Sequence, residues 1–344
     1  MLALLILLAD PVPVIFETDY AGDCDDVGAL AALHGLIDRG EAELLMVGVN
    51  REEVRRASGP AIDVVNTFYG RGDIPIGTDQ TDVAQWRRLS PYAAALRQEF
   101  PHDSADDDQL PPAVPLYRRT LAAADDGSVV VISVGGTTNL GNLLKTGPDE
   151  FSDLDGATLV RRKVRLLSIM FGRFPDSHVM PGGQPEMNTR IDPAANRLVA
   201  DRWPTPIIYS GWEVGHPIHT GRGLLPLGLD NPVRRAFELH PGMRPKPRTQ
   251  SKRGTKPLSA LHRGKASYDQ TAVLVGVRGT GEHFGLVRGR LDLGDDNRHH
   301  GWIDDPDGRD AYLTIQTSPD AIAAEIESLM VPYKRYKRVN ESVD

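Results

Sequence analysis

The sequence predicts a single α/β domain with a mostly parallel central β-sheet flanked by helices. Three observations support this prediction. Short β-rich runs alternate with amphipathic helical segments, which is the order of repeated βαβ units. Residues 128–134 (SVVVISV) are almost continuously apolar, as expected of a central strand buried on both faces. Neither an internal repeat nor a linker divides the 344 residues, so one domain is favoured.

The expected elements follow one another along the chain. Strands are expected at residues 14–16, 44–49, 74–76, 128–134, 164–170 and 206–209. Helices are expected at residues 26–38, 61–69, 93–100, 116–124, 138–145, 193–201 and 319–329. Residues 272–277 are interpreted as a buried helix or strand, followed by a β-rich tail. The polar, proline-bearing segment 82–113 is interpreted as a surface insertion.

The two ends of the chain differ from its middle. Residues 1–9 (MLALLILLA) form an apolar run that suits a signal-peptide core and is too short to span a bilayer. The run lacks a basic start and a clear cleavage site, so a signal peptide and an apolar N-terminal segment both stay open. A cytoplasmic and an exported location therefore stay open as well. We divide the chain into a segment 1–10, a domain 11–335 and a charged tail 336–344, and no later run could span a membrane.

Charge and cysteine content limit the partners. The chain has 47 acidic and 39 basic residues and a net charge of -8, so nucleic acid is not expected as the main partner. Six basic residues gather in the loop 241–257, which is interpreted either as a solvated loop or as a lid over the active site. Cys24 is the only cysteine, so no intramolecular disulfide can form.

Four aspartates lie within eight residues, directly between the first buried strand and the helix that follows. They are Asp19, Asp23, Asp25 and Asp26. Ligands of open α/β sheets bind at the carboxyl ends of the strands, so these side chains stand where a site is expected. Carboxylates this close repel one another unless a cation or protons offset them. Oxygen ligands suit Ca²⁺ or Mg²⁺ rather than zinc, whereas the spacings of an EF-hand and of a phosphate-binding P-loop are absent.

Four separated motifs carry a resemblance to a known family. The segment VIFETDYAGDCDDVGAL (residues 14–30) resembles the signature of the inosine/uridine-preferring nucleoside hydrolases, in the longer form with an extra aspartate found in many bacterial members. SVGGTTNL (133–140), PEMN with the following IDPAA (185–195) and SYDQTAVL (267–274) then occur in the family's order. No single motif would suffice, but their joint order makes the resemblance specific over roughly residues 12–280.

This resemblance implies a fold, an activity and a set of site residues. The fold is that of the nucleoside hydrolases, and the activity is calcium-dependent hydrolysis of the N-glycosidic bond of ribonucleosides. Asp19, Asp26, Asp269 and the carbonyl of Thr138 would hold Ca²⁺, with Asp19 as general base and Asp25 on the 2′-hydroxyl. The other substrate contacts implied are Asn50, Glu186 and Asn188. The partner would be a small ribonucleoside, and a homo-oligomer, either a dimer or a tetramer, is expected.

The leaving-group side departs from the family pattern. Tyr268 replaces the histidine that precedes the last metal aspartate in one major branch. A tyrosine can stack on a base or donate a hydrogen bond, but its pKa of about 10 makes it a weaker acid than imidazolium. His262 and Lys265 are alternative donors, although each is also explained as a surface residue. Trp212, at the end of a strand, is interpreted as a pocket residue or a core residue.

Other departures keep two further functions open. Glu17 stands where an aspartate is usual, and His178 and Met180 stand where the family often carries a ribose-contacting asparagine. One alternative is therefore a non-catalytic, calcium-dependent nucleoside- or carbohydrate-binding protein of the same fold. The other is a hydrolase of a different ribosyl compound, with a phosphate meeting the basic loop 241–257.

Overall fold

The computed structural model describes residues 10–20, 22–50, 55–81, 83, 89–175, 185–241, 259–293 and 301–332. Its central sheet has nine strands: β1 (Val12–Thr18), β2 (Ala42–Val49), β3 (Ile76–Thr78), β4 (Val129–Val134), β5 (Val164–Met170), β6 (Ile207–Ser210), β9 (Phe284–Asp292), β10 (Gly301–Asp304) and β11 (Asp310–Ile315). They lie in the order β10-β9-β11-β6-β5-β4-β1-β2-β3. All neighbours from β11 to β3 pair in parallel. The expected mostly parallel α/β sheet is confirmed.

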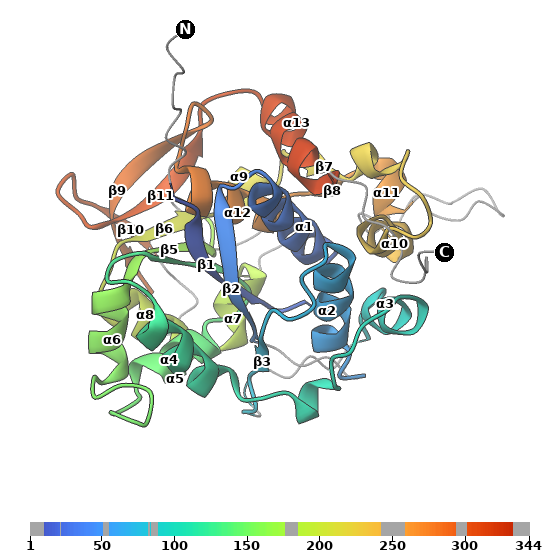
Figure 1. Cartoon of the computed structure of the whole chain (residues 1–344). Coiled ribbons are helices and arrows are strands. Elements are labelled where there is room, and N and C mark those ends of the chain that lie inside the picture. Colours follow the sequence, from blue (N-terminus) through green and yellow to red (C-terminus); the bar gives the residue numbers. More distant parts are fainter. Residues whose placement is uncertain are drawn as a thin grey trace, which may run out of the picture.

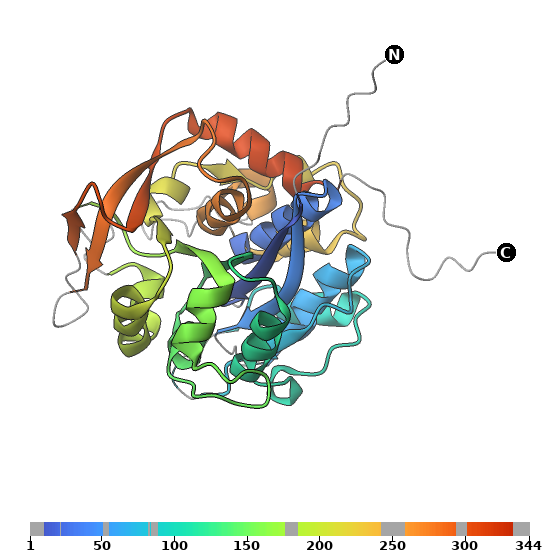
Figure 2. The same ribbon diagram turned by 60° about the vertical axis from the view of Figure 1, so that its left-hand side comes forward.

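Helices cover both faces of this sheet (Figure 1). They are α1 (Asp25–Asp38), α2 (Ser58–Phe68), α3 (Ala93–Glu99), α4 (Ala113–Ala123), α5 (Thr138–Leu144), α6 (Gly156–Lys163), α7 (Met187–Ile191), α8 (Pro193–Arg202), α9 (Trp212–Gly215), α10 (Pro232–Leu239), α11 (Ala260–Arg263), α12 (Tyr268–Arg278) and α13 (Pro319–Met330). The antiparallel strands β9 and β10 form one end of the sheet (orange to red in Figure 2). Two-residue strands β7 (His219–Thr220) and β8 (Lys265–Ala266) pair separately.

Alternate residues of the inner strands enter two different apolar layers. Phe16 of β1 and Ile132 of β4 belong to the layer that contains α1, whereas Ile15 and Val131 belong to the opposite layer. Because side chains alternate across a strand, continuous apolar runs are what a sheet covered on both faces requires. This double burial explains why the inner strands were recognisable in the sequence.

Two segments differ from the expectations, and the helix alternative for residues 272–277 is confirmed. The strand expected at 74–76 lies at 76–78, since Pro75 has no N–H to give to the sheet ladder. Residues 272–277 belong to the longer helix α12. The segment 82–113 is not confined to the surface, because Tyr92 and Leu96 are fully buried. Among the described residues, no helix combines the length and the apolar character needed to cross a bilayer.

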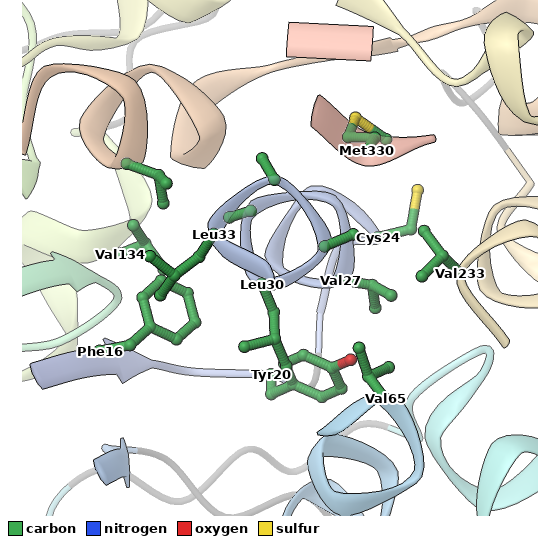
Figure 3. Close-up of a cluster of buried hydrophobic side chains, with 14 of the residues drawn as sticks. Phe16, Tyr20, Cys24, Val27, Leu30, Leu33, Val65, Val134, Val233 and Met330 are labelled. Atoms are coloured by element: carbon green, nitrogen blue, oxygen red, sulfur yellow. The ribbon is translucent and has the colours of Figure 1, made fainter. Parts of the chain in front are cut away.

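Helix α1 is the centre of its layer, and residues 25–36 of this helix are all buried. Figure 3 shows Phe16 and Val134 of the sheet on one side of α1, and Val233 of α10 and Met330 of α13 on the others. A methyl group at Gly35 would lie 2.1 Å from the carbonyl oxygen of Leu329, so only glycine allows α13 to approach this closely. Such packing holds α1, and with it the aspartates at its N-terminus, in one position.

A distant aspartate completes the N-terminus of α2. The fully buried carboxylate of Asp107 accepts hydrogen bonds from the N–H groups of Gly59 at 2.7 Å and Ser58 at 3.2 Å. The neighbouring Asp108 instead pairs with Arg56 at the surface. The first aspartate satisfies helix donors that would otherwise be buried without a partner.

We expect Asp107→Ala to lower the free energy of unfolding by about 1–3 kcal/mol, because two buried N–H groups lose their acceptor. The matched variant Asp108→Ala removes only an exposed ion pair and should cost less than about 1 kcal/mol. Urea denaturation of both variants measures the difference. Equal losses would contradict the capping role of Asp107.

Candidate functional site

Three buried carboxylates converge at the carboxyl edge of the sheet. Asp25 and Asp26 lie in the first turn of α1, and Asp269 lies in the first turn of α12. One oxygen of each lies within 4.8 Å of the other two. Their exposed fractions are 2%, 2% and 5%, so little water separates the charges. The fold thus brings the last sequence motif to the first one.

The three groups cannot all carry a full charge without compensation. Burial raises the pKa of Asp25 to about 6, although the charge of Lys265 opposes this rise. Burial also raises the pKa values of Asp26 and Asp269 well above the usual value, and the charge of Asp19 adds to both shifts. Asp19 therefore faces the same cluster. Hydrogen bonds stabilise only part of this charge, chiefly the bond from Thr18 Oγ1 to Asp26 Oδ1 at 2.5 Å.

The donor set fits a hard divalent cation. All three ligand candidates are carboxylates, which are the ligands that Ca²⁺ and Mg²⁺ prefer. Asp25 Oδ1 is buried and accepts no hydrogen bond from the described residues. Thr138 begins α5 and is buried, and its Oγ1 also lacks a hydrogen-bond partner among the described residues. The assignment of Asp19 and Thr138 as ligands stays a prediction.

A polar network lies at the carboxyl ends of β1 and β2. The Glu17 carboxylate accepts hydrogen bonds from Tyr117 Oη at 2.5 Å and from Asn139 Nδ2 at 2.6 Å. Burial raises its pKa to about 7. Asn50 Oδ1 accepts the N–H of Gly136 at 3.1 Å. These bonds tie the ends of β1 and β2 to the β4–α5 turn, so Asn50 has a structural contact in addition to the sugar contact predicted for it.

Glu186 and Asn188 also have partners within the protein. The Glu186 carboxylate caps α7 by accepting the N–H of Asn188 at 3.0 Å, and it accepts the N–H of Gly172 at 3.1 Å. Asn188 Nδ2 donates to the carbonyl of Met170 at 3.0 Å. Burial raises the pKa of Glu186 to about 7. The two side chains connect the end of β5 to α7, and their contacts with a sugar stay predictions.

Three aromatic rings stand beside the acidic cluster. Trp212 and His216 of the α9 region stack with ring centroids 4.0 Å apart, and the Tyr268 ring lies nearly parallel to both with centroids 6.4 Å away. His216 Nδ1 lies 3.1 Å from Tyr268 Oη. Gly215 permits this assembly, because a methyl group there would lie 2.4 Å from Tyr268 Cα. Arg173 lies over the Trp212 ring at 5.6 Å.

Several side chains differ in placement from the sequence interpretations. Lys265 is 6% exposed, so its interpretation as a surface residue is wrong, whereas His262 is exposed. His216 was not identified as a site residue from the sequence. His216 follows Trp212 by four residues, a spacing that places two side chains on the same face of a helix, but the short helix α9 was not predicted. His178, Met180 and the basic loop from residue 242 to residue 257 lie outside the described residues.

A mostly parallel sheet with buried carboxylates at its carboxyl edge is typical of α/β proteins that bind small ligands there. No protein-family model matches the sequence, and no curated protein matches it either. Solved structures do match, and several are nucleoside hydrolases.

The purine-preferring ribonucleoside hydrolase from Gardnerella vaginalis has a TM-score of 0.67 and 15% identity, over 92% of this chain and 98% of that one. The plant nucleoside hydrolase PpNRh1 has a TM-score of 0.62 and 20% identity, over 94% and 100%. The type III effector protein XopQ, complexed with adenosine diphosphate ribose, has a TM-score of 0.63 and 15% identity, over 94% of each chain. This chain therefore has the nucleoside hydrolase fold that its motifs predict.

The raised pKa values predict a stability that falls with pH when cations are removed. An unfolded aspartate ionises with a pKa of about 3.9, whereas Asp25 does so at about 6 in the fold. Between these values the unfolded chain binds fewer protons than the folded one, so stability declines as pH rises. In EDTA we expect the Tm to fall from about pH 4 to pH 6 and beyond. Thermal scans at several pH values measure the slope.

The variant Asp26→Asn is the control for this trend. It removes a carboxylate whose own pKa is raised and whose charge raises the pKa of Asp269, so the Tm of this variant should depend less on pH than that of the wild type. Parallel pH profiles for the two proteins would show that the cluster does not cause the effect.

Proposed function

We propose that this protein hydrolyses the N-glycosidic bond of ribonucleosides with Ca²⁺ at the acidic cluster, giving ribose and free base. The observation that carries the proposal is the convergence of Asp25, Asp26 and Asp269 at the carboxyl edge of the sheet. The nucleoside hydrolase fold and the four motifs support the substrate class. Ca²⁺ binds several oxygen ligands at once, so three converging carboxylates suit this ion.

The chemistry sets three requirements on the site. Cleavage develops positive charge on the sugar, so the site needs negative charge near the ring, a positioned water and a way to protonate the departing base. Asp19, Asp26, Asp269 and the Thr138 carbonyl would hold the ion, which when bound orients the sugar hydroxyls and acidifies a water. Asp19 takes the proton of the water as the oxygen–C1′ bond forms and the C1′–nitrogen bond breaks.

The sugar contacts use atoms that the protein leaves available. Asp25 is assigned to the 2′-hydroxyl, since its Oδ1 accepts no hydrogen bond from the described residues, although the ammonium of Lys265 lies at ion-pair distance, 3.5 Å away. Asn188 uses Nδ2 to hold Met170, which leaves its Oδ1 for a sugar hydroxyl. Glu186 and Asn50 are rigid because backbone N–H groups already hold them. Rigid contacts of this kind lower the entropic cost of placing the ribose.

The departing base is assigned to the aromatic rings. Trp212 offers a flat apolar face for a base, and Tyr268 offers a hydroxyl next to the metal aspartate. Burial raises the pKa of Tyr268 to about 12, so this phenol alone is a poor acid. Its contact with His216 supplies the missing acidity: His216 passes a proton to Tyr268 as Tyr268 passes its own to the base. The relay requires the protonated imidazole, and because burial lowers the pKa of His216 the protonated fraction grows only as the pH falls.

The central test is base release by purified protein with Ca²⁺. Asp19→Ala should lower kcat by about 10²–10⁴-fold, the contribution of a positioned general base, and chelation should abolish activity. The matched control is Asp126→Ala, which should keep full activity. Asp126 is an exposed aspartate that pairs with Arg162 at the surface. Full activity of Asp19→Ala would refute the mechanism.

The substrate panel separates the alternatives. It contains purine and pyrimidine ribonucleosides, and it includes adenosine diphosphate ribose because XopQ is described in complex with that compound. Turnover of this compound alone would favour a hydrolase of another ribosyl compound. Ribose-dependent binding in calorimetry, with no turnover of any member, would favour the non-catalytic binding protein.

The leaving-group assignment has its own prediction. Tyr268→Phe and His216→Ala should each lower kcat by about 10²-fold, because each breaks the proton path. The KM should change little for Tyr268→Phe, which keeps the aromatic ring. His262→Ala is the control, since this histidine is exposed and hydrogen-bonds only locally to Ser259. Steady-state kinetics measures the three variants. A loss confined to KM would assign these rings to binding alone.

A further inference from the structure

One lysine is buried inside the acidic site. Lys265 comes from the short strand β8 and is 6% exposed. Its Nζ lies 3.0 Å from Asp23 Oδ2 and 3.5 Å from Asp25 Oδ1. A lysine is almost never buried unless its charge is paired. The position of Lys265 between two aspartates of the first motif therefore requires an explanation beyond packing.

Asp23 has a different environment from the three clustered carboxylates. Its Oδ1 lies 2.8 Å from His240 Nε2, and its Oδ2 lies 3.0 Å from Lys265 Nζ. Both oxygens therefore have basic neighbours. The side chain is also 46% exposed, whereas Asp25 is buried. Asp23 thus stands outside the cluster, with Lys265 between it and Asp25.

Lys265 also contacts the leaving-group side. Its Nζ lies 4.7 Å from the centre of the Tyr268 ring, within the range of a cation–π contact. Burial lowers the pKa of Lys265, but Asp23 and Asp25 outweigh burial and raise it well above the usual value. The ammonium group therefore stays charged while it contacts the β1–α1 loop, the start of α1 and the start of α12.

We propose that Lys265 is a fixed internal cation of the site, which positions Asp25 and supplies part of the positive charge that the carboxylates need. The inference rests on the proposed function for the role of Ca²⁺. Without Lys265, Asp23 and Asp25 repel each other in a protein free of metal. A divalent cation would then bind more tightly, because the ammonium beside Asp25 no longer repels it. Lys265 is in this sense a positioning residue that moderates metal affinity.

The test compares Lys265→Met with Asp23→Asn. Lys265→Met should lower the Tm in EDTA, enlarge the Tm gain on adding CaCl₂, and lower the Kd for Ca²⁺ at least about tenfold in calorimetry. Asp23→Asn leaves Lys265 paired with Asp25 alone, so the Kd should rise instead. Base release by Lys265→Met should slow in kcat although Ca²⁺ binds more tightly. A purely structural loss would not separate these two quantities.

Two further variants complete the design. Lys265→Arg keeps the charge and should retain nearly wild-type Tm and Kd. Lys163→Met removes a lysine paired with Asp126 at 2.9 Å on helix α6, and its effect should not depend on Ca²⁺. The proposal is overturned if Lys265→Met matches Lys163→Met in EDTA, or if Lys265→Met and Asp23→Asn shift the Kd in the same direction.

The remaining outcomes are also decisive. If Lys265→Met does not fold, Asp23→Asn decides alone, and an unchanged or lower Kd for Ca²⁺ overturns the proposal. If the wild type binds no Ca²⁺, the metal in the proposed function is refuted. The Tm of Lys265→Met in EDTA then still decides: a loss beyond that of Lys163→Met supports the positioning of Asp25, and an equal loss overturns it.

Discussion

Repulsion between buried carboxylates is the constraint on which the rest of the site depends. Asp25, Asp26 and Asp269 lie within 4.8 Å of one another, and burial removes the water that would screen them. Two features of the fold reduce this cost. All three lie in first turns of helices, where the helix dipole favours negative charge. Lys265 adds a full positive charge beside Asp25. A bound cation would neutralise the negative charge that the helix dipoles and Lys265 do not compensate.

The surrounding fold keeps this repulsive arrangement from relaxing. Helix α1 is buried on all sides and contacts α13 so closely at Gly35 that it cannot shift without a clash. At the end of β1, Glu17 is held by Tyr117 and Asn139, and these bonds join β1 to helices of the opposite layer. Charges held apart by a rigid frame cannot rearrange to relieve one another, and an arrangement of that kind suits tight binding of an ion.

The parts that were predictable from the sequence depend on local patterns. The strand 164–170 was predicted at its observed bounds, and α1 within one residue, because apolar runs and helical spacing are local properties. The motifs predicted that Asp269 lies close to the aspartates of the first motif, but this prediction came only from the family resemblance. The burial of Lys265 and its pairing with Asp23 were not predictable, since they depend on how β8 packs against a loop 242 residues earlier in the sequence. Helix α10 was not predicted, although Asn231 as N-cap followed by Pro232 at the first helical position is a local signal for a helix start.

The metal side and the leaving-group side are physically coupled through one residue. Lys265 Nζ lies 3.5 Å from Asp25 Oδ1 and 4.7 Å from the Tyr268 ring. Burial raises the pKa of Tyr268, and the charge of Lys265 opposes that rise. An ion bound in the cluster would partly neutralise the charge of Asp25 without moving it, which would leave the ammonium less neutralised and make the tyrosine a stronger acid. Metal binding and proton donation would then not be independent steps, because the same ammonium takes part in both.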